Sequence, residues 1–494
     1  MNREFFNSLA CGVHASVIAV ALLVIPLSFQ SCNGDDAALE VPQYELHRGT
    51  LSDISWSKSY TPREFENAFS TVIGGMDLNL LKSIGIDMGP MFGKIADGLL
   101  ENQGDVLQEL FDEEQGRKNA KWEMQAYSIT FNSVGYKGEP IELSAIVAFP
   151  NAVNGTQFHV LDNISVYNHA RVDENDRVPS KVGDIMLLRA FYNQLVVIPD
   201  EEGSGASIDH YFAETENDRN AQQTIDAIKA ALELIGGMGI EMREGYGTWN
   251  FGISLGGETC VGFHHYMEVN ATPEERRLVN LKATFGGAGV ITPSMYFDLF
   301  DKGEPVTSLD MGLALNQLEG LLELPASAFG GYDPKSQLFS PELFEMESLM
   351  FPEVTLMESR RQMLGMEYPD EAFQKIFQED MLDSNGRFNH DSPKTQALFN
   401  YFKKCDLGYG WTPSVKFTLV WSDEDQKMIP YMHQQAYKNL RKLPGGGTNP
   451  LMKKHEVDLS FLGQLLASMS HHVLCAYYFL ECVGNENPED LGTY

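Results

Sequence analysis

The amino-acid sequence predicts an α/β fold built on a mostly parallel β-sheet that helices cover on both faces. From residue 121 onward, short apolar runs typical of strands alternate with helical segments. This alternation is typical of parallel sheets, because a parallel pair of strands needs a helical crossover. Helical, Met- and Leu-rich sequence interrupts the alternation between 293 and 409, and sheet-like sequence resumes at Val415. We therefore expect a sheet domain with a helical insertion.

The strands can be placed in order along the chain. Two alternating segments, 127–134 and 141–150, flank a turn that contains glycine and predict an antiparallel hairpin. A helix is expected over 224–235. The remaining strands are expected at 163–167, 195–198, 248–253, 281–285 and 415–421.

The pattern divides the 494 residues into six segments. Residues 33–60 are polar and show no sustained period, whereas apolar residues between 61 and 120 recur at helical spacing. We expect a signal peptide at 1–31, a tether at 32–60, an N-terminal helical segment at 61–120, the first part of the sheet domain at 121–292, a helical cap insertion at 293–409 and the second part of the sheet domain at 410–494.

The N-terminus carries an export signal. Arg3 precedes an apolar stretch, 9–29, and Ser31-Cys32 follows with polar residues after it. This arrangement resembles the signal of bacterial lipoproteins, in the looser form found in Bacteroidetes-type bacteria. The resemblance implies that Cys32 becomes the lipidated first residue of an exported protein held on a bacterial membrane, the outer membrane being expected. An ordinary cleaved signal or an uncleaved anchor are the alternatives.

The charge balance excludes one class of partner. The chain has 69 acidic and 36 basic residues, so its net charge of -33 repels nucleic acids. We find no dinucleotide fingerprint and no Walker motif. His264-His265 comes without a zinc motif such as H-E-x-x-H. We therefore expect no cofactor and no metal.

A serine between glycines is the strongest candidate for chemistry. Gly252-Ile253-Ser254-Leu255-Gly256-Gly257 directly follows the strand-like Thr248–Phe251. A sharp strand-to-helix turn tolerates only small neighbours and exposes a serine hydroxyl as a nucleophile.

Two downstream sites offer the partners that such a serine needs. Asp423 and Asp425 follow the strand expected at 415–421, where sites in parallel sheets form. His471-His472 precede a helix-like segment. The order serine, aspartate, histidine is the one used on the α/β-hydrolase fold.

Three further stretches make the resemblance to the α/β-hydrolase superfamily explicit, and in particular to its secreted lipases and esterases with a helical cap. Residues 196–207 look like the family's strand followed by a D-x-x-G-x-G-x-S loop. Gly410–Pro413 and Ile429–Tyr431 are similar to the sequence around its aspartate. The resemblance covers 121–292 and 410–494.

The resemblance assigns roles to individual residues. Ser254 matches the nucleophile, Asp425 the acid with Asp423 as the alternative, and His472 the base with His471 as the alternative. The oxyanion hole would use the backbone N–H groups of Leu255 and Ala170, where alanine replaces the family's glycine.

The function expected is therefore cofactor-independent hydrolysis of carboxylic esters through an acyl-enzyme, with a small-molecule or lipid ester as substrate. The alternatives are a peptidase on the same fold and an inactive binding protein anchored at the surface. Acyl chain, alcohol, membrane face, oligomeric state and any pairing of the four mature cysteines stay open.

Overall fold

The computed structural model describes residues 47–60, 64, 72–73, 76–77, 122–152, 160–172, 175–210, 215–295, 321–322, 324–340, 377–423 and 430–456. The predicted signal peptide and Cys32 lie outside the described residues, as does most of the segment 61–120. Asp425, His471 and His472 also lie outside them.

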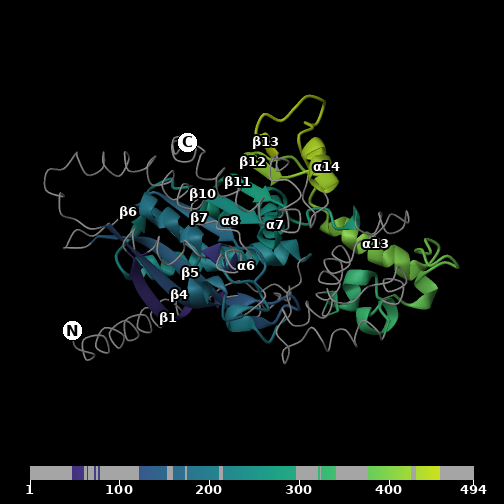
Figure 1. Cartoon of the computed structure of the whole chain (residues 1–494), viewed down its shortest axis with the longest axis horizontal. Coiled ribbons are helices and arrows are strands. Elements are labelled where there is room, and N and C mark those ends of the chain that lie inside the picture. The colour runs from purple at the N-terminus through teal and green to yellow at the C-terminus, as the bar shows by residue number, and fades with distance from the viewer. Residues whose placement is uncertain are drawn as a thin grey trace, which may run out of the picture. The chain divides into compact units, whose positions relative to one another are not determined.

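A nine-stranded sheet forms the centre of the structure, in the order β1-β4-β5-β8-β7-β10-β11-β12-β13 (Figure 1). Its strands are β1 (Leu51–Tyr60), β4 (Trp122–Val134), β5 (Pro140–Ala152), β7 (Asn163–Asn168), β8 (Gln194–Pro199), β10 (Thr248–Ile253), β11 (Leu281–Gly287), β12 (Lys416–Trp421) and β13 (Met452–Glu456). Short two-residue ladders pair β2 (Val72–Ile73) with β3 (Met76–Asp77), and β6 (Val160–Leu161) with β9 (Glu241–Met242). The strands from β8 to β13 in the sheet order run parallel, whereas β1, β4 and β5 are antiparallel. The expected mixed, mostly parallel sheet is confirmed.

Strand β1 differs from the sequence prediction, which placed residues 51–60 in the tether. The strand pairs antiparallel with β4 at the edge of the sheet, and most of its side chains are exposed. Its sequence is mostly polar because an edge strand is held by backbone hydrogen bonds and not by burial. A period-2 apolar signal is therefore missing from the sequence.

Helices connect and cover the parallel strands. The described helices of the sheet domain are α5 (Pro179–Val182), α6 (Asn217–Gly237), α7 (Leu255–Val269), α8 (Pro273–Val279) and α14 (Pro430–Leu440), with short 3-10 helices η2 (Ile185–Tyr192) and η3 (Gly205–Ser207). Helix α6 contains the expected helix at 224–235 and begins seven residues earlier. Helix α8 starts with a capping box, in which Thr272 and Glu275 satisfy each other's backbone N–H groups.

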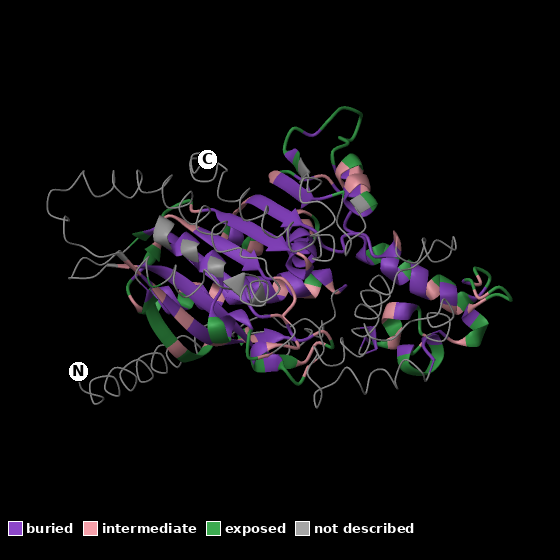
Figure 2. Ribbon diagram, in the orientation of Figure 1, coloured by how far each residue is buried: buried purple, intermediate pink, exposed green. Residues whose placement is uncertain are grey.

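The strands of the central sheet are mostly buried (Figure 2), and apolar side chains form core clusters on both of its faces. Along β5, Leu143, Ala145 and Val147 belong to one core cluster, whereas Ile146 and Ala148 belong to the other. Helices α6 and α7 contribute to the first cluster, and η2 and α14 to the second. Strands buried on both faces explain the continuous apolar runs in the sequence.

The described part of the predicted cap has a core of its own. Its elements are η4 (Ala326–Phe329), η5 (Pro334–Leu338), η7 (Glu379–Met381) and α13 (Pro393–Cys405). The buried aromatic rings of this cluster include Phe329, Phe339, Phe377, Phe388 and Phe402. Hydrogen bonds from Tyr401 join the cluster to the start of α6, because its hydroxyl lies 2.6 Å from Thr215 Oγ1 and donates to Glu216.

Two further observations bear on the sequence analysis. Among the described residues, no helix is long and apolar enough to cross a membrane. Cys260 and Cys405 are buried thiols that form no disulfide.

A partly buried polar cluster ties the end of α7 to the segment just before β12. Glu268 on α7 accepts hydrogen bonds from Ser414 N and Oγ, at 2.6 and 2.8 Å, and lies 3.3 Å from His264 Nε2. His264 is fully buried, and its ring packs against Trp411 and Phe417. This histidine therefore packs in the core and bonds to Glu268.

The charge of Glu268 depends on these partners. Burial by itself would raise the pKa of the carboxyl, but the hydrogen bonds from His264 and Ser414 outweigh it and lower the pKa to about 2. Burial lowers the pKa of His264, so its ring stays neutral and donates through Nε2.

We expect Glu268→Gln to lower the free energy of unfolding near neutral pH by about 1–2 kcal/mol, because hydrogen bonds to a charged acceptor are the stronger ones. Folding depresses this pKa from 4.5, so the stabilisation is present above 4.5 and is lost as the pH falls toward about 2. Urea denaturation of both proteins over this pH range should therefore give curves that converge in acid.

The exposed Glu274 on α8 supplies the control. Glu274→Gln should change stability by less than about 0.5 kcal/mol at every pH. A constant difference between wild type and Glu268→Gln across the range would contradict the explanation.

Candidate active site

The connection of the strands makes the carboxyl ends of β7 and β10 the point where the strand order reverses. The chain runs from β7 to β8 on one side, and then returns through α6 to β10 on the other side of β7. Loops leaving two such strands diverge, and ligands of open α/β sheets bind in the crevice between them. Asn168, the last residue of β7, pairs with Gly252 near the end of β10.

Ser254 stands at this point as the only residue between strand β10 and helix α7. Its backbone has φ 59° and ψ -128°, a conformation that costs a residue with a side chain about 1–3 kcal/mol. Three hydrogen bonds hold it: Ser254 N donates to Gly287 O at 2.9 Å, and Ser254 O accepts from Gly257 N and Glu258 N at 2.8 and 3.2 Å. The strained strand-to-helix turn that the motif predicts is therefore present.

The three glycines of the motif each meet a neighbouring backbone. A Cβ on Gly252 would overlap Gly256 O, one on Gly256 would overlap Asn168 O, and one on Gly257 would overlap Gly287 O. All three contacts are far inside the 3.0 Å that real Cβ atoms keep. Glycine is required here because the turn packs directly on the ends of β7 and β11.

The loop after β11 supports the turn from the other side. Gly289 packs against Ser254 O and Glu258 N, where a Cβ would not fit. Ala288 beside it has a φ of 49°, and its N–H donates to Val420 O on β12 at 3.1 Å. Residues 287–289 are not among the predicted site residues, although the run Gly-Gly-Ala-Gly at the end of a strand is a recognisable signal of a turn.

The two residues expected to supply oxyanion N–H groups flank the contact between α7 and the β7 loop. Leu255 is the first residue of α7, and the first N–H groups of a helix have no acceptor within the helix. They also carry the positive end of the helix dipole, which favours a developing negative charge. Ala170 follows Asn168 and His169, whose carbonyls lie against Gly256.

Buried charges lie beneath the β7 loop. His169 is 2 % exposed and its Nδ1 lies 2.7 Å from Ala170 O. Burial lowers the pKa of His169, but the charges of Glu201, Asp200 and Asp184, together with the Ala170 carbonyl, outweigh this and raise it. Burial raises the pKa of Asp184 to about 6, against the hydrogen bond from Met186 N. The loop thus contains a buried histidine in the electrostatic field of three carboxyl groups, a feature that sequence spacing did not reveal.

The residues 200–207 that resemble the family's loop form a tightly bonded turn. Asp200 accepts from Ser144 Oγ at 2.6 Å and from Ser180 N at 3.1 Å. Ser144 Oγ in turn accepts from Ala206 N at 2.9 Å. Gly205, at φ 60°, packs on Ser144 and Asp200 so closely that no side chain fits. This turn sets the path of the chain after β8.

The structure describes only one of the two candidate acids. Asp423 is exposed, and its Oδ1 accepts from Trp421 Nε1 at 3.2 Å and from Gln434 Nε2 at 2.8 Å. These bonds tie it to β12 and α14. Asp425, His471 and His472 lie outside the described residues, so the triad stays a prediction.

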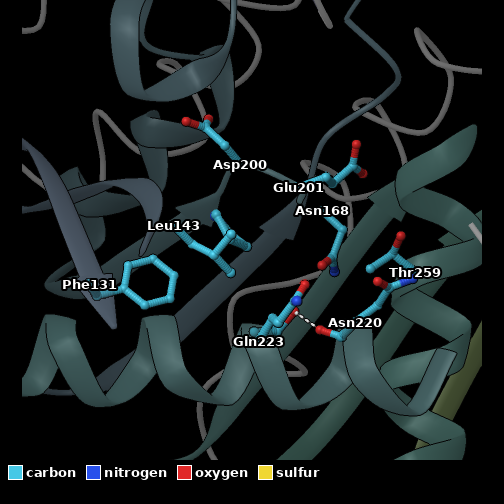
Figure 3. Close-up of a pocket in the computed structure, with 10 residues that line it drawn as sticks. Phe131, Leu143, Asn168, Asp200, Glu201, Asn220, Gln223 and Thr259 are labelled. Carbon is cyan, nitrogen blue, oxygen red and sulfur yellow. Dashed lines mark hydrogen bonds between the residues drawn. The ribbon is translucent and has the colours of Figure 1, made fainter. Parts of the chain in front are cut away.

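A cavity of about 20 Å³ lies beside Asn168, the last residue of β7 (Figure 3). Its lining includes Asn168 on β7, Asn220, Gln223 and Thr224 on α6, and Thr259 on α7. This volume holds about one water molecule. Ligand pockets are usually about 300–1,000 Å³, so the cavity is too small for a substrate.

Comparison with solved structures relates this fold to esterases. A mutant of the rice cell wall degrading esterase LipA from Xanthomonas oryzae superposes with a TM-score of 0.61 at 18% identity, covering 90% of this chain and 99% of that chain. The unsubstituted esterase gives 0.58 at 18% identity, covering 88% and 97%. A proposed hydrolase from Legionella pneumophila gives 0.54 at 15% identity, covering 88% and 99%. The chain therefore has the α/β-hydrolase fold of these proteins.

No family model matches this chain. No curated protein matches it in sequence.

If the turn at Ser254 forms the active site, Gly256→Ala should lower kcat for hydrolysis of a p-nitrophenyl ester by at least about 100-fold. The added methyl overlaps Asn168 O and must push the β7 loop away from the start of α7. Ester hydrolysis and far-UV circular dichroism would be measured on the same sample.

Gly237→Ala is the matched control, because this glycine is exposed in the last turn of α6 and a Cβ there meets nothing within 4 Å. It should leave hydrolysis unchanged. Full activity in folded Gly256→Ala would show that the close approach is not needed.

Proposed function

We propose that this chain is a serine hydrolase that cleaves carboxylic esters, with Ser254 as its nucleophile. The observation that carries the proposal is the strained turn at Ser254, where Gly256 packs on the end of β7, Gly257 on the end of β11, and Gly252 on Gly256 within the turn. Strain of this kind persists only where the surroundings enforce it, and it concentrates at functional sites. The turn also lies at the switch point of the sheet, where ligands bind.

The reaction follows from the roles of the proposed triad. His472 accepts the proton of Ser254 as Oγ attacks the ester carbonyl, and Asp425 holds the His472 ring in the required tautomer. The N–H groups of Leu255 and Ala170 would stabilise the negative charge on the carbonyl oxygen. His472 then returns the proton to the leaving alcohol, and an acyl-enzyme remains. Water activated by the same histidine hydrolyses it to the carboxylic acid and free Ser254.

The described contacts support Asp425 over Asp423 as the acid. Two donors on β12 and α14 already use Oδ1 of Asp423, and its side chain is exposed. A triad acid works in a buried position, hydrogen-bonded to its histidine. His472 is proposed over His471 on the sequence resemblance alone.

Carboxylic esters are the proposed substrates because the similar Xanthomonas protein is an esterase. A peptidase on the same scaffold uses the same residues, and a panel of esters and peptides distinguishes the two. An inactive binding protein would keep the fold and lose the chemistry.

We expect a fluorophosphonate probe to label the wild type and to fail on Ser254→Ala. Asp425→Asn and His472→Gln should lower kcat for short p-nitrophenyl esters by about 10⁴-fold or more. Asp423→Asn and His471→Gln are the matched controls and should retain activity within a few-fold. Failure of the wild type to label or to hydrolyse esters would refute the enzyme assignment, whereas loss in Asp423→Asn alone would exchange the two acids.

We further propose that Cys32 carries lipid and anchors the exported chain to a bacterial membrane, the outer one being expected. The apolar stretch before Cys32 and the polar residues after it support this. Radiolabelled palmitate should enter the wild type and not Cys32→Ala. Cys260→Ala is the control, because this thiol is buried in the fold. Equal incorporation in all three proteins would refute the anchor.

A further inference from the structure

A second cluster of chemistry-bearing side chains lies away from Ser254, where the β4–β5 turn meets the loop after β8. Glu139 comes from the turn, and Glu202 and His210 come from the loop. One potential ligand atom from each residue lies within 4.8 Å of the others. None of the three has a role in the proposed hydrolysis.

The spacing of these atoms matches a metal centre. His210 Nδ1 lies 3.3 Å from Glu202 Oε1 and 3.7 Å from Glu139 Oε1. Ligands at 2.0–2.1 Å from a tetrahedral zinc ion are about 3.4 Å from each other. The two histidine–carboxylate separations lie within a few tenths of an ångström of this value, and the three ligand atoms all lie within 4.8 Å of one another.

The electrostatics of the cluster favour a cation. Glu202 is 2 % exposed, so its carboxylate is withdrawn from water. A buried carboxylate needs a nearby cation or hydrogen-bond donors, and a divalent ion at this position would supply the charge.

An unused acceptor gives an independent indication. Glu139 Oε2 is buried and has no hydrogen-bond partner within the described part of the chain. Gly135 makes room for this carboxylate, because a Cβ there would lie 2.7 Å from Glu139 Oε1. A buried carboxylate oxygen without a donor is costly, and metal coordination is one of the few ways to satisfy it.

We propose that Glu139, Glu202 and His210 form a site for a divalent transition-metal ion of the Zn²⁺ class, with a fourth position open to water. One nitrogen and two carboxylate oxygens suit zinc, whereas Ca²⁺ and Mg²⁺ prefer oxygen ligands alone.

The ion would have a structural role. It joins the β4–β5 turn to the loop after β8, and Gln223 on α6 supports the site by donating to Glu202 Oε2 at 2.6 Å. The same loop carries Asp200 and Glu201, which help to line the cavity in Figure 3. The site therefore fixes the base of the loop beside the crevice.

Isothermal titration of the purified full-length chain with Zn²⁺, after treatment with a chelator, tests the proposal. We expect one ion bound per chain in the wild type, and at least about tenfold weaker binding in Glu139→Gln and His210→Ala. Glu244→Gln and His47→Ala alter exposed residues elsewhere and should bind as the wild type does. Zinc should also raise the melting temperature of the wild type and of both controls, and not that of the two site variants.

The outcomes separate the alternatives. No saturable binding by the wild type, or equal binding by the wild type and folded Glu139→Gln, would overturn the site and leave a His–carboxylate ion pair. Tighter binding of Ca²⁺ than of Zn²⁺ would overturn the metal class. Glu139 is partly exposed, so Glu139→Gln should fold. It therefore still tests the site if His210→Ala fails to fold. Binding is read without ester hydrolysis, so the result is independent of the proposed enzyme activity.

Discussion

The structure of the candidate site depends on direct backbone contact between the turn at Ser254 and the ends of two neighbouring strands. Gly256 meets the carbonyls of β7, and Gly257 meets the last residue of β11. Because these two glycines have no Cβ, α7 starts within van der Waals distance of both strands. The helix N-terminus, the β7 loop and the serine therefore converge on one point. The strain at Ser254 is offset by the hydrogen bonds and packing that this approach makes available. A looser turn would keep the fold and lose the convergence.

Polar clusters, and not apolar packing, fix the loops around that point. The apolar clusters on the two faces of the sheet define where strands and helices lie, but loops cannot bury enough apolar surface to be held in this way. Asp200 bonds to Ser144 and Ser180, and Glu268 bonds α7 to Ser414 at the start of β12. Each cluster joins segments far apart in the chain. Each also contains a carboxylate whose charged form needs specific donors, so the loop geometry is sensitive to the loss of single hydrogen bonds.

The sequence predicted the features that local pattern encodes. The strand at 248–253 was placed with the observed bounds, because six apolar or small residues end at a glycine–serine motif. Strand β1 was missed because an exposed edge strand carries no apolar period. Strand β13 was also missed, since Met-Lys-Lys-His-Glu has the composition of a surface loop and is a strand only through its pairing with β12. The carboxyl groups near His169 could not be predicted from the sequence. Asp184, Asp200 and Glu201 come close to this histidine only because of the order of the strands in the sheet.

The proposed metal site cannot be recognised from sequence motifs, for the same physical reason. Zinc motifs recognisable in sequence place two ligands on one short segment, such as one helical turn. Glu139 and Glu202 are brought together by pairing between β5 and β8, in which Ala145 lies opposite Pro199, and His210 joins them through the bonded turn that begins at Asp200. The register of two antiparallel strands therefore sets the spacing of the carboxylates. A shift of that register by one residue would turn β5 side chains to the opposite face of the sheet and remove Ser144 from Asp200. The Ser144–Asp200 hydrogen bond and the proposed ion site thus depend on one strand pairing, and each joins the β5 side of that pairing to the loop after β8.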